Sequence, residues 1–430
     1  MSYYLRHYFQ PDFNHVHVRP IPMADGNTDA CYLGYVQSVV AGQVLAELVR
    51  LDGSSENGRP EELAAPESAT AASPIPETDM ASIVGGTGEA SETAACGYNN
   101  FIQNTDSVDS RFVYEKPVFP LGPNCTRDPQ NPNRIISLIN GFCFYHNGLI
   151  TVKNLLNVRQ DVDFRTGNII FAGNILVHGD VKPGFRLTGG NIQIKGRVDG
   201  GRLRAEGSVA VHGALKGAPS ALINAKGTVR LASCEQARVI TRGNLIIDGN
   251  CMHSDLFVGG SLIVKGRLQG GTVHANGVVY IKDQLGNVQG APTKISLGYN
   301  PIDYMHLNEL TLQHQDQTQK LQYHTNRARK GPHFAAESAP YQELANQKLA
   351  VIKSMQSAAW RRFSQDVRKA DRTRVLVPGT VYPGVEISIG RAYYKVIDEH
   401  HDVFFAMHED EVVNGFPALS KNFSLGKDIS

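Results

Sequence analysis

Hydrophobic and polar residues alternate in a pattern that repeats along the chain from Asn174 onward. Read in register, the copies are "NILVHGDVKPGFRLTGG", "NIQIKGRVDGGRLRAEG", "SVAVHGALKGAPSALINAKG", "TVRLASCEQARVITRG", "NLIIDGNCMHSDLFVGG", "SLIVKGRLQGGTVHANG" and "VVYIKDQLGN". The unit is about 17 residues long, with three residues more in the third copy and one fewer in the fourth. A period of this length without a helical pattern indicates a solenoid in which each copy forms one coil.

The second and fourth positions of each copy are apolar, which predicts a strand whose apolar side faces the interior. These pairs are Ile175/Val177, Ile192/Ile194, Val209/Val211, Val229/Leu231, Leu245/Ile247 and Leu262/Val264. Position eight adds Val181, Val198, Leu215 and Leu268, and a second strand follows with Leu203/Ala205 and Val273/Ala275 inward. Each copy closes on a glycine, where we expect a turn with positive φ: Gly190, Gly207, Gly227, Gly243, Gly260 and Gly277.

One copy has too few inward residues to offset the entropy of ordering its backbone. Copies stacked about 4.8 Å apart share a parallel hydrogen-bond ladder and one continuous core. The predicted fold class is therefore mainly β, with a parallel β-helix of about 17-residue coils over residues 161–300.

The residues before the repeat divide into three predicted regions. Residues 1–50 form an N-terminal β segment in which Val36, Val39, Val40 and Val44 suggest two short strands around Gly42. Residues 51–98 are rich in Ser, Ala, Pro, Glu and Gly, which predicts a flexible acidic linker or insertion. Residues 99–160 alternate short β runs with Pro, Asn and Gly turns, so we expect a β-rich region.

After the repeat, the three-four spacing of apolar residues predicts an antiparallel helical hairpin over residues 301–372. Its first helix runs to Lys330, "GPHF" breaks it, and the second runs from Pro340 to Ala370. Strand patterns return over residues 373–414, and residues 415–430 form a tail. The hairpin is thus predicted to be an insertion into a β body.

Composition adds few constraints on partners. The 42 basic and 41 acidic residues leave a formal charge of +1, so we do not expect nucleic acid as a partner. No apolar run approaches the roughly 18 residues of a membrane helix, and the first residues lack a secretory apolar stretch. We therefore expect a cytoplasmic protein without a membrane span. The six cysteines are far apart and form no CxxC pair, which predicts free thiols.

The outward positions of the coils provide the first candidate interface. Position three is apolar at Leu176, Ile246, Ile263 and Tyr280, the last three on successive coils. An apolar stripe outside the core usually marks a covered surface. We prefer cover by the inserted hairpin, and another subunit of a homo-oligomer is the alternative.

Basic residues of the hairpin provide the second candidate interface, formed by Arg361, Arg362, Arg368 and Lys369. A solvated helix face is the alternative interpretation, because no aromatic platform accompanies the charge. Position five of the coils carries His178, Lys195, His212, Asp248 and Lys265, and the two histidines are about two coils, 9.6 Å, apart. Metal ligands lie within about 2 Å of their ion, so we expect a solvated polar column. We predict no catalytic, cofactor or metal site.

Several short sequence segments resemble those of the bacterial flagellar assembly protein A family. They are "VDFRTGNI" (162–169), "GDVKPGF" (179–185), "IKGRVDGG" (194–201) and "GTVYPGVEISIG" (379–390). The resemblance implies a parallel, right-handed β-helix, a coiled-coil-like hairpin, and a role in flagellar assembly or placement, with no catalytic residues to carry over. The coils also resemble those of bactofilins and of the C-terminal half of the division inhibitor MinC.

These observations leave three hypotheses for function. The first is a non-enzymatic cytoplasmic scaffold whose hairpin recruits protein partners, including flagellar or polar machinery. The second is a polysaccharide- or nucleotide-binding β-helix, with or without enzymatic activity. The third is a bactofilin-like polymer, which would need uncapped ends.

Overall fold

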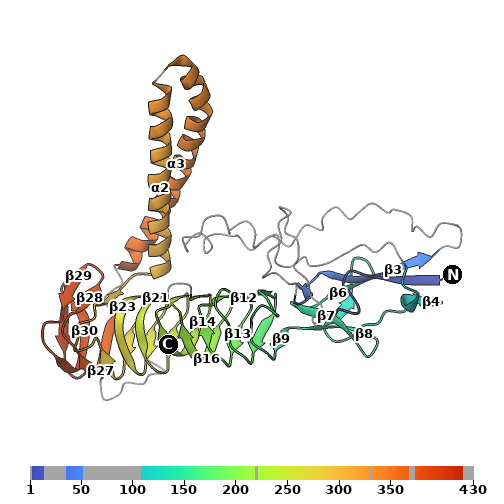
Figure 1. Cartoon of the computed structure of the whole chain (residues 1–430), viewed down its shortest axis with the longest axis horizontal. Helices are drawn as coiled ribbons and strands as arrows, with labels where there is room; N and C mark the ends of the chain where they lie inside the picture. Colours follow the sequence, from blue (N-terminus) through green and yellow to red (C-terminus); the bar gives the residue numbers. More distant parts are fainter. Residues whose placement is uncertain are drawn as a thin grey trace. The chain divides into compact units, whose positions relative to one another are not determined.

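The computed structural model describes residues 2–13, 35–51, 108–217, 221–329, 331–367 and 373–419. The predicted acidic linker, from Asp52 onward, lies outside the described residues. The described chain forms two compact units, one ending at Lys226 and the other starting at Gly227, and Figure 1 shows their elements. Two parts lie outside the repeat. They are the five-stranded sheet that begins the first unit and the helical hairpin of the second unit.

The first unit opens with two antiparallel sheets. The five-stranded sheet has the order β4-β1-β3-β6-β5, and the three-stranded sheet has the order β2-β7-β8. The two strands predicted around Gly42, which has a φ of +84°, are β2 and β3. However, β2 pairs with β7 and not with β3. The bounds are β1 Ser2–His7, β2 Ser38–Val39, β3 Val44–Leu51, β4 Val113–Tyr114, β5 Cys125–Arg127, β6 Arg134–Ser137, β7 Gly141–His146 and β8 Leu149–Lys153, with a short 3-10 helix at Ser110–Phe112.

The first coils of the solenoid complete this unit. Ile175 pairs with Ile192 and Ile192 with Val209, in parallel and one copy apart. Leu187 and Leu203 pair in the same way on a second face. The strands are β9 Leu155–Val158, β10 Ile169–Ile170, β11 Asn174–Val177, β12 Arg186–Gly189, β13 Ile192–Ile194, β14 Val198–Asp199, β15 Arg202–Ala205, β16 Val209–Lys216 and β17 Leu222–Ala225.

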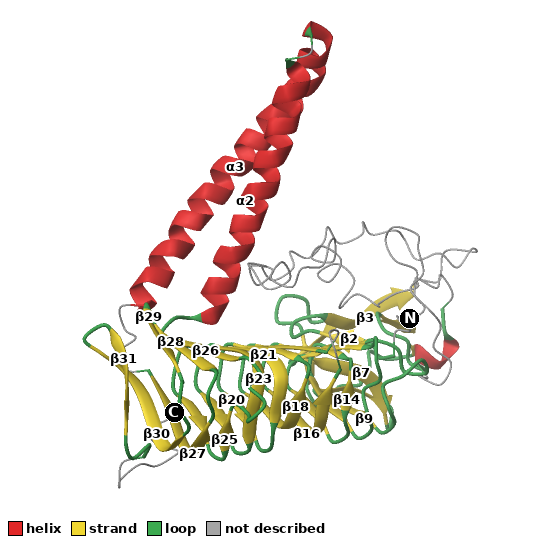
Figure 2. Ribbon diagram, turned by 60° about the vertical axis from the view of Figure 1, so that its left-hand side comes forward, coloured by secondary structure: helices red, strands yellow, loops and turns green. Residues whose placement is uncertain are grey.

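The second unit repeats the same coil geometry, and Figure 2 shows its stacked strands. Leu245 pairs with Val229 on one side and Leu262 on the other, and Leu262 in turn pairs with Val279. The strands are β18 Val229–Glu235, β19 Arg238–Thr241, β20 Leu245–Ile247, β21 Cys251–Val258, β22 Leu262–Val264, β23 Arg267–Ala275, β24 Val279–Ile281, β25 Gln284–Leu285 and β26 Thr293–Leu297.

The inward positions predicted from the alternation are confirmed. Both members of every predicted pair, from Ile175/Val177 to Leu262/Val264, are no more than 2% exposed, as are the predicted residues at position eight and on the second strand. Each strand therefore supplies its even-spaced side chains to the core, and the fold class, a parallel β-solenoid, is as predicted.

The prediction for the closing glycines is wrong. Gly190, Gly207, Gly243, Gly260 and Gly277 do not have positive φ. At four of them a side-chain oxygen of the preceding coil stands close to where a Cβ would be, and at Gly243 the backbone of Gly227 does. At Gly207 that atom is Asn191 Oδ1, and at Gly277 it is Ser261 Oγ. The asparagine is held there because its Oδ1 accepts a hydrogen bond from the backbone N–H of Ser208, at 2.8 Å.

The hairpin is inserted between β26 and β27, as predicted. Its helices are α2 Pro301–Ala328 and α3 Pro332–Val367. The second helix begins eight residues earlier than predicted, because Pro332 suits the first turn of a helix, where its missing N–H has no intrahelical partner. Pro340, taken as the start, lies inside α3. Among the described residues, neither helix is apolar enough over sufficient length to cross a membrane.

The chain returns from the hairpin to the coils and then closes their end. Leu376 pairs in parallel with Tyr280, and Ile387 pairs in parallel with Ile295. The next strands then run antiparallel, so that no further coil is added. The bounds are β27 Arg374–Val381, β28 Val385–Ile389, β29 Ala392–Lys395, β30 His400–His408 and β31 Glu411–Gly415.

Candidate interaction surfaces

Three of the four predicted stripe residues form a continuous row, and that row extends beyond them. Ile246, Ile263 and Tyr280 are direct neighbours on β20, β22 and β24. Leu376 on β27 continues the row, and Phe404 follows on the antiparallel β30. We call these five residues the apolar ladder. It stops at Gly415 of β31, which pairs with Phe404 and lacks the side chain that would crowd the Phe404 ring.

One end of the apolar ladder is covered by the chain itself. Tyr280 is 4% exposed and Leu376 6% exposed, and Val278, Phe404 and Leu419 pack against them. This cover comes from the C-terminal strands and the residues after them. The prediction that the hairpin covers the stripe is wrong, because the contacts of its base lie on another face of the coils.

Leu176, the fourth predicted stripe residue, has different neighbours. It lies on β11, half-buried, between Asn157 of β9 and Gln193 of β13. Its row is therefore polar on both sides. Within the first unit, Leu176 alone does not extend an apolar surface.

The hairpin is anchored at its base by an aromatic cluster around His274 on β23. The His274 ring stacks between Phe257 of β21, 5.0 Å away, and Tyr304 of α2, 5.8 Å away. The hydroxyl oxygen of Tyr299 lies 2.6 Å from His274 Nδ1. Phe363 of α3 packs against the rings of both Tyr299 and Tyr304. We call this the junction cluster.

Burial in the junction cluster changes the acid-base behaviour of its polar members. Desolvation lowers the pKa of His274 and raises the pKa of Tyr299 to about 12. The histidine is therefore favoured in its neutral form, and its Nδ1 and the tyrosine hydroxyl share one hydrogen bond. The cluster serves to fix α2 and α3 on the β21–β23 face.

The hairpin buries few apolar side chains between its helices. Leu310, Ile352 and Ala359 form its core, with Leu307 packed against them. Farther along, the buried His324 Nδ1 and Ser338 Oγ have no hydrogen-bond partner among the described residues. The seam between the helices is thus weakly apolar over much of its length.

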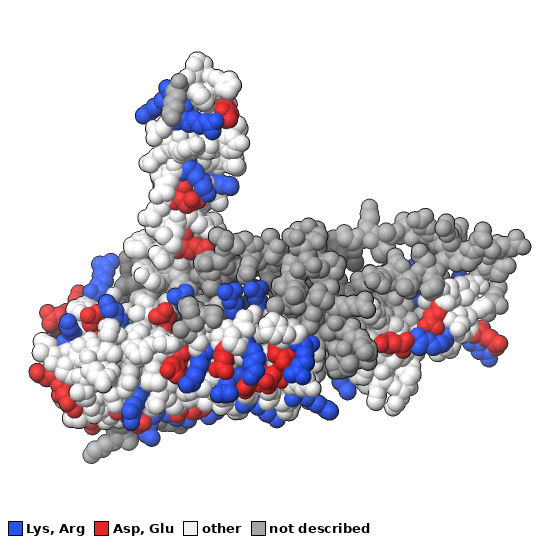
Figure 3. Space-filling view, in the orientation of Figure 1, with Lys and Arg blue, Asp and Glu red and all other residues white. Residues whose placement is uncertain are grey.

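A face of α3 instead exposes apolar side chains. Tyr341, Leu344, Val351 and Met355 are between 39% and 58% exposed. Their spacing of three, seven and four residues places them on one side of the helix. We call these four residues the α3 face. In Figure 3 the visible side of the hairpin carries few charged atoms apart from small groups along its length.

The predicted basic residues of the hairpin are only partly described. Arg361 is exposed on α3, and Arg362 lies in α3 with a side chain outside the described ones. Arg368 and Lys369 lie outside the described residues altogether. The basic cluster therefore remains a prediction.

The position-five column is exposed and polar, as predicted. Lys195 Nζ lies 3.2 Å from His178 Nδ1, and His212 lies 3.0 Å from the Gln193 amide. In the second unit, Asp248 bonds to Arg230 and Lys265 on the coils to either side, at 2.8 and 2.7 Å. Those two partners hold the pKa of Asp248 below its usual range.

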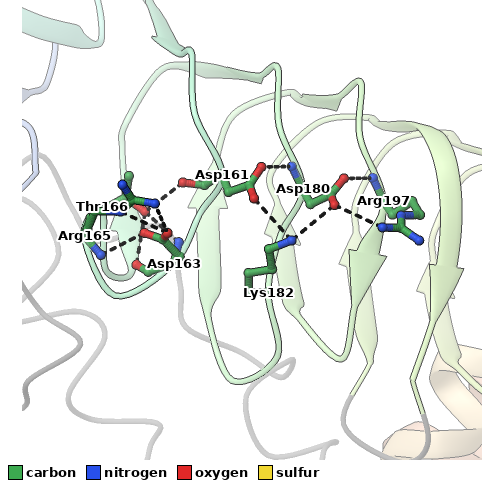
Figure 4. A network of polar contacts seen from close by, with 7 residues as sticks. All are labelled: Asp161, Asp163, Arg165, Thr166, Asp180, Lys182 and Arg197. Carbon is green, nitrogen blue, oxygen red and sulfur yellow. Dashed lines mark hydrogen bonds and ion pairs between the residues drawn. The ribbon is translucent and has the colours of Figure 1, made fainter.

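A network of acids and bases links the corners of the first coils (Figure 4). Asp161 Oδ1 accepts from the backbone N–H of Asp180, and Asp180 Oδ1 accepts from that of Arg197, both at 2.8 Å. Lys182 bridges the remaining carboxylate oxygens of both aspartates at 3.2 Å. The bond from Arg197, aided by Lys182, lowers the pKa of Asp180. Each corner aspartate thus accepts a hydrogen bond from a backbone N–H of the next coil.

These acids have the geometry of structural bonds and not of a reactive pair. Asp180 accepts a backbone N–H and neighbours a lysine, so it is stabilised as an anion and is a poor proton donor at neutral pH. Among the described residues no three His, Cys, Asp or Glu side chains are grouped to hold a metal.

Two comparisons give no match: the chain matches no curated protein and no solved structure. A family model, the Flagellar Assembly Protein A beta solenoid domain, matches residues 154–412. That range covers more than half of the chain and includes the coils, the inserted hairpin and the returning strands. The chain therefore belongs to the Flagellar Assembly Protein A β-solenoid family.

Proposed function

We propose that the chain is a non-enzymatic cytoplasmic scaffold of flagellar assembly or placement, and that its hairpin recruits protein partners. The observation that carries this proposal is the α3 face. A helix pair that buries Leu310, Ile352 and Ala359 but exposes four apolar side chains on one face has surface left for another molecule. The junction cluster supports the proposal, since it holds the base of the hairpin on rigid coils.

The polymer hypothesis receives less support. A growing stack of coils needs open strand edges at its ends. In the second unit β29, β30 and β31 run antiparallel over the end of the coils. In the first unit Ser38 of β2 accepts from Ala172, and Phe142 of β7 packs near Phe171. In each unit, residues outside the repeat thus lie against an end coil, which favours closed ends over a growing stack.

The glycan- or nucleotide-binding hypothesis also receives less support. Glycoside hydrolysis requires two free carboxyl groups about 5 to 9.5 Å apart. Asp180 is paired with Lys182 of its own coil and with Arg197 of the next coil. Asp248 is paired with Arg230 and Lys265 on the coils to either side. Their charges are therefore balanced within the protein.

The test is a pair of substitutions on the α3 face, Leu344→Asp with Val351→Asp, in a strain whose own gene has been replaced. The matched control, Gln315→Asp with Gln319→Asp, adds the same charge at exposed positions of α2. Circular dichroism of both purified variants checks that the helices persist. We expect fewer or misplaced flagella with the α3 variant and normal flagella with the control. Normal flagella with the α3 variant would contradict the proposal.

A further inference from the structure

The α3 face repeats at the spacing of a coiled-coil seam. Lys348 is exposed and lies between the two apolar pairs of this face, Tyr341 with Leu344 and Val351 with Met355. The steps between the five residues are three, four, three and four, so they occupy alternating a and d positions of a heptad. Such a row accepts the apolar edge of a second helix, whose side chains repeat at the same interval.

The other helix of the hairpin does not occupy this row. The α3 residues that pack with Leu310 of α2 are Ile352 and Ala359. Ile352 follows Val351 directly, and one step along a helix is a rotation of about 100°. Accordingly, Ile352 is 9% exposed and Val351 is 58% exposed. One apolar row of α3 is therefore covered by α2, and a second row is left for another molecule.

Lys348 determines which kind of helix fits the α3 face. Among the described residues, Lys348 has no acidic partner, whereas Lys320 and Arg327 of α2 are paired with Asp316 and Glu337. An apolar residue placed over Lys348 would remove water from the ammonium group without replacing its hydrogen bonds. A carboxylate at the facing position would instead supply both the hydrogen bond and the opposite charge. A single charged residue in an apolar row thus selects its partner.

A second copy of the chain fits the α3 face poorly. Lys348 lies midway between Tyr341 and Met355. The parallel and the antiparallel alignment that cover all five residues both place the two Lys348 side chains against each other. Like charges in this position oppose association. The charge of the row therefore favours a different chain as the occupant.

We propose that the α3 face binds an amphipathic helix of a partner protein, with an acidic residue of that helix facing Lys348. This inference rests on the proposed function and names the kind of partner that the hairpin recruits. The row from Tyr341 to Met355 is about 21 Å long, so a partner helix of three heptads covers it.

The test uses two synthetic helical peptides of three heptads with leucine at their a and d positions. One peptide has Glu and the other has Lys in the middle of its apolar row. Both carry a fluorescent dye and are used below the concentration at which they self-associate. Fluorescence anisotropy measures their binding to the full chain. We expect the Glu peptide to bind about tenfold more tightly, because it pairs with Lys348 and the Lys peptide is repelled.

Reversing the charge on the chain is expected to reverse this preference. With Lys348→Glu, the Lys peptide binds about tenfold more tightly than the Glu peptide. The control is Lys353→Glu, which makes the same change at an exposed position on another side of α3 and keeps the preference for the Glu peptide. Equal binding of the two peptides to the unchanged chain, or binding of neither, would overturn the proposal.

Two further measurements separate this proposal from other outcomes. In sedimentation of the full chain alone, we expect no association that depends on the α3 face. Association that Leu344→Asp with Val351→Asp abolishes would identify a second copy as the occupant and would overturn the proposal. If the same two substitutions disturb flagella while neither peptide binds, the proposed function stands and the helical partner is refuted.

Discussion

Replacing Gly207 with alanine tests why the closing glycines are required. A Cβ at this position would overlap Asn191 Oδ1 and lie 3.0 Å from Asn191 Cγ. The asparagine side chain must then move, and it loses its 2.8 Å bond from the Ser208 N–H. The backbone itself does not oppose the change, since Gly207 does not have a positive φ.

The loss of unfolding free energy expected for Gly207→Ala has two contributions. Loss of the exposed corner hydrogen bond costs about 1 kcal/mol, and overpacking costs about 1 to 3 kcal/mol. We therefore expect Gly207→Ala to lower the free energy of unfolding by about 2 to 4 kcal/mol. Asn191→Ala alone is expected to cost about 1 kcal/mol, for the lost bond.

The double variant gives the decisive comparison. With Asn191→Ala in place the space is empty, so adding Gly207→Ala is expected to cost little or to stabilise by about 0.5 kcal/mol through the unfolded chain. The assay is urea unfolding of the full chain followed by circular dichroism. Gly184→Ala is the control, since a φ of +86° and open space around it predict a cost that does not depend on Asn191. If Gly207→Ala costs the same with and without Asn191→Ala, the crowding argument is refuted.

Three further predictions concern burial and charge. Burial lowers the pKa of His7 from 6.5 to about 4, so the stabilisation of the fold by neutral His7 is complete above pH 6.5, and about 3 kcal/mol of it is lost as the pH falls to 4. The protection factors of the β1 amides, which are corrected for the intrinsic pH dependence of exchange, are expected to fall over this range, and constant protection factors would contradict the prediction. Leu376→Ala is expected to lower the unfolding free energy by about 2 to 3 kcal/mol, measured by urea unfolding, and a loss below about 0.5 kcal/mol would show that the ladder is not packed. Asp248→Asn is expected to cost about 0.5 to 1 kcal/mol at low salt and less at high salt, whereas a cost unchanged by salt would argue against its ion pairs with Arg230 and Lys265.

The inward face of the coils could be predicted because it depends on a local pattern. A period of two within each copy, repeated every 17 residues, assigns Ile192, Val209, Leu245 and Leu262 to the core without any knowledge of tertiary contacts. The outward row Ile246, Ile263 and Tyr280 could be identified for the same reason.

The contacts that the coils make with residues outside the periodic pattern could not be predicted. Gly207 has a role set by Asn191 one coil away, and residue type alone does not distinguish crowding from positive φ. The cover of Tyr280 comes from Leu419, which is remote in sequence and bears no periodic relation to the repeat.

The junction cluster was missed by the sequence analysis, although one signal was present. Phe257 and His274 occupy the same position of successive copies, so the repeat itself predicts that the two rings stack on one face. Tyr299, Tyr304 and Phe363 are scattered along the chain, and only the inserted hairpin brings them together. A search for outward aromatic residues at equal copy positions would have located the site.

The stacking of successive coils is tested most directly by nuclear Overhauser contacts between backbone amide protons in the deuterated full chain. The structure predicts contacts between residues 17 apart, such as Ile246 with Ile263 and Ile263 with Tyr280. It also predicts that the outer strands of this row have a second parallel neighbour, so that Ile246 contacts Arg230 and Tyr280 contacts Leu376. Contacts of an antiparallel pattern between consecutive strands of the same copy, without the 17-residue contacts, would contradict it.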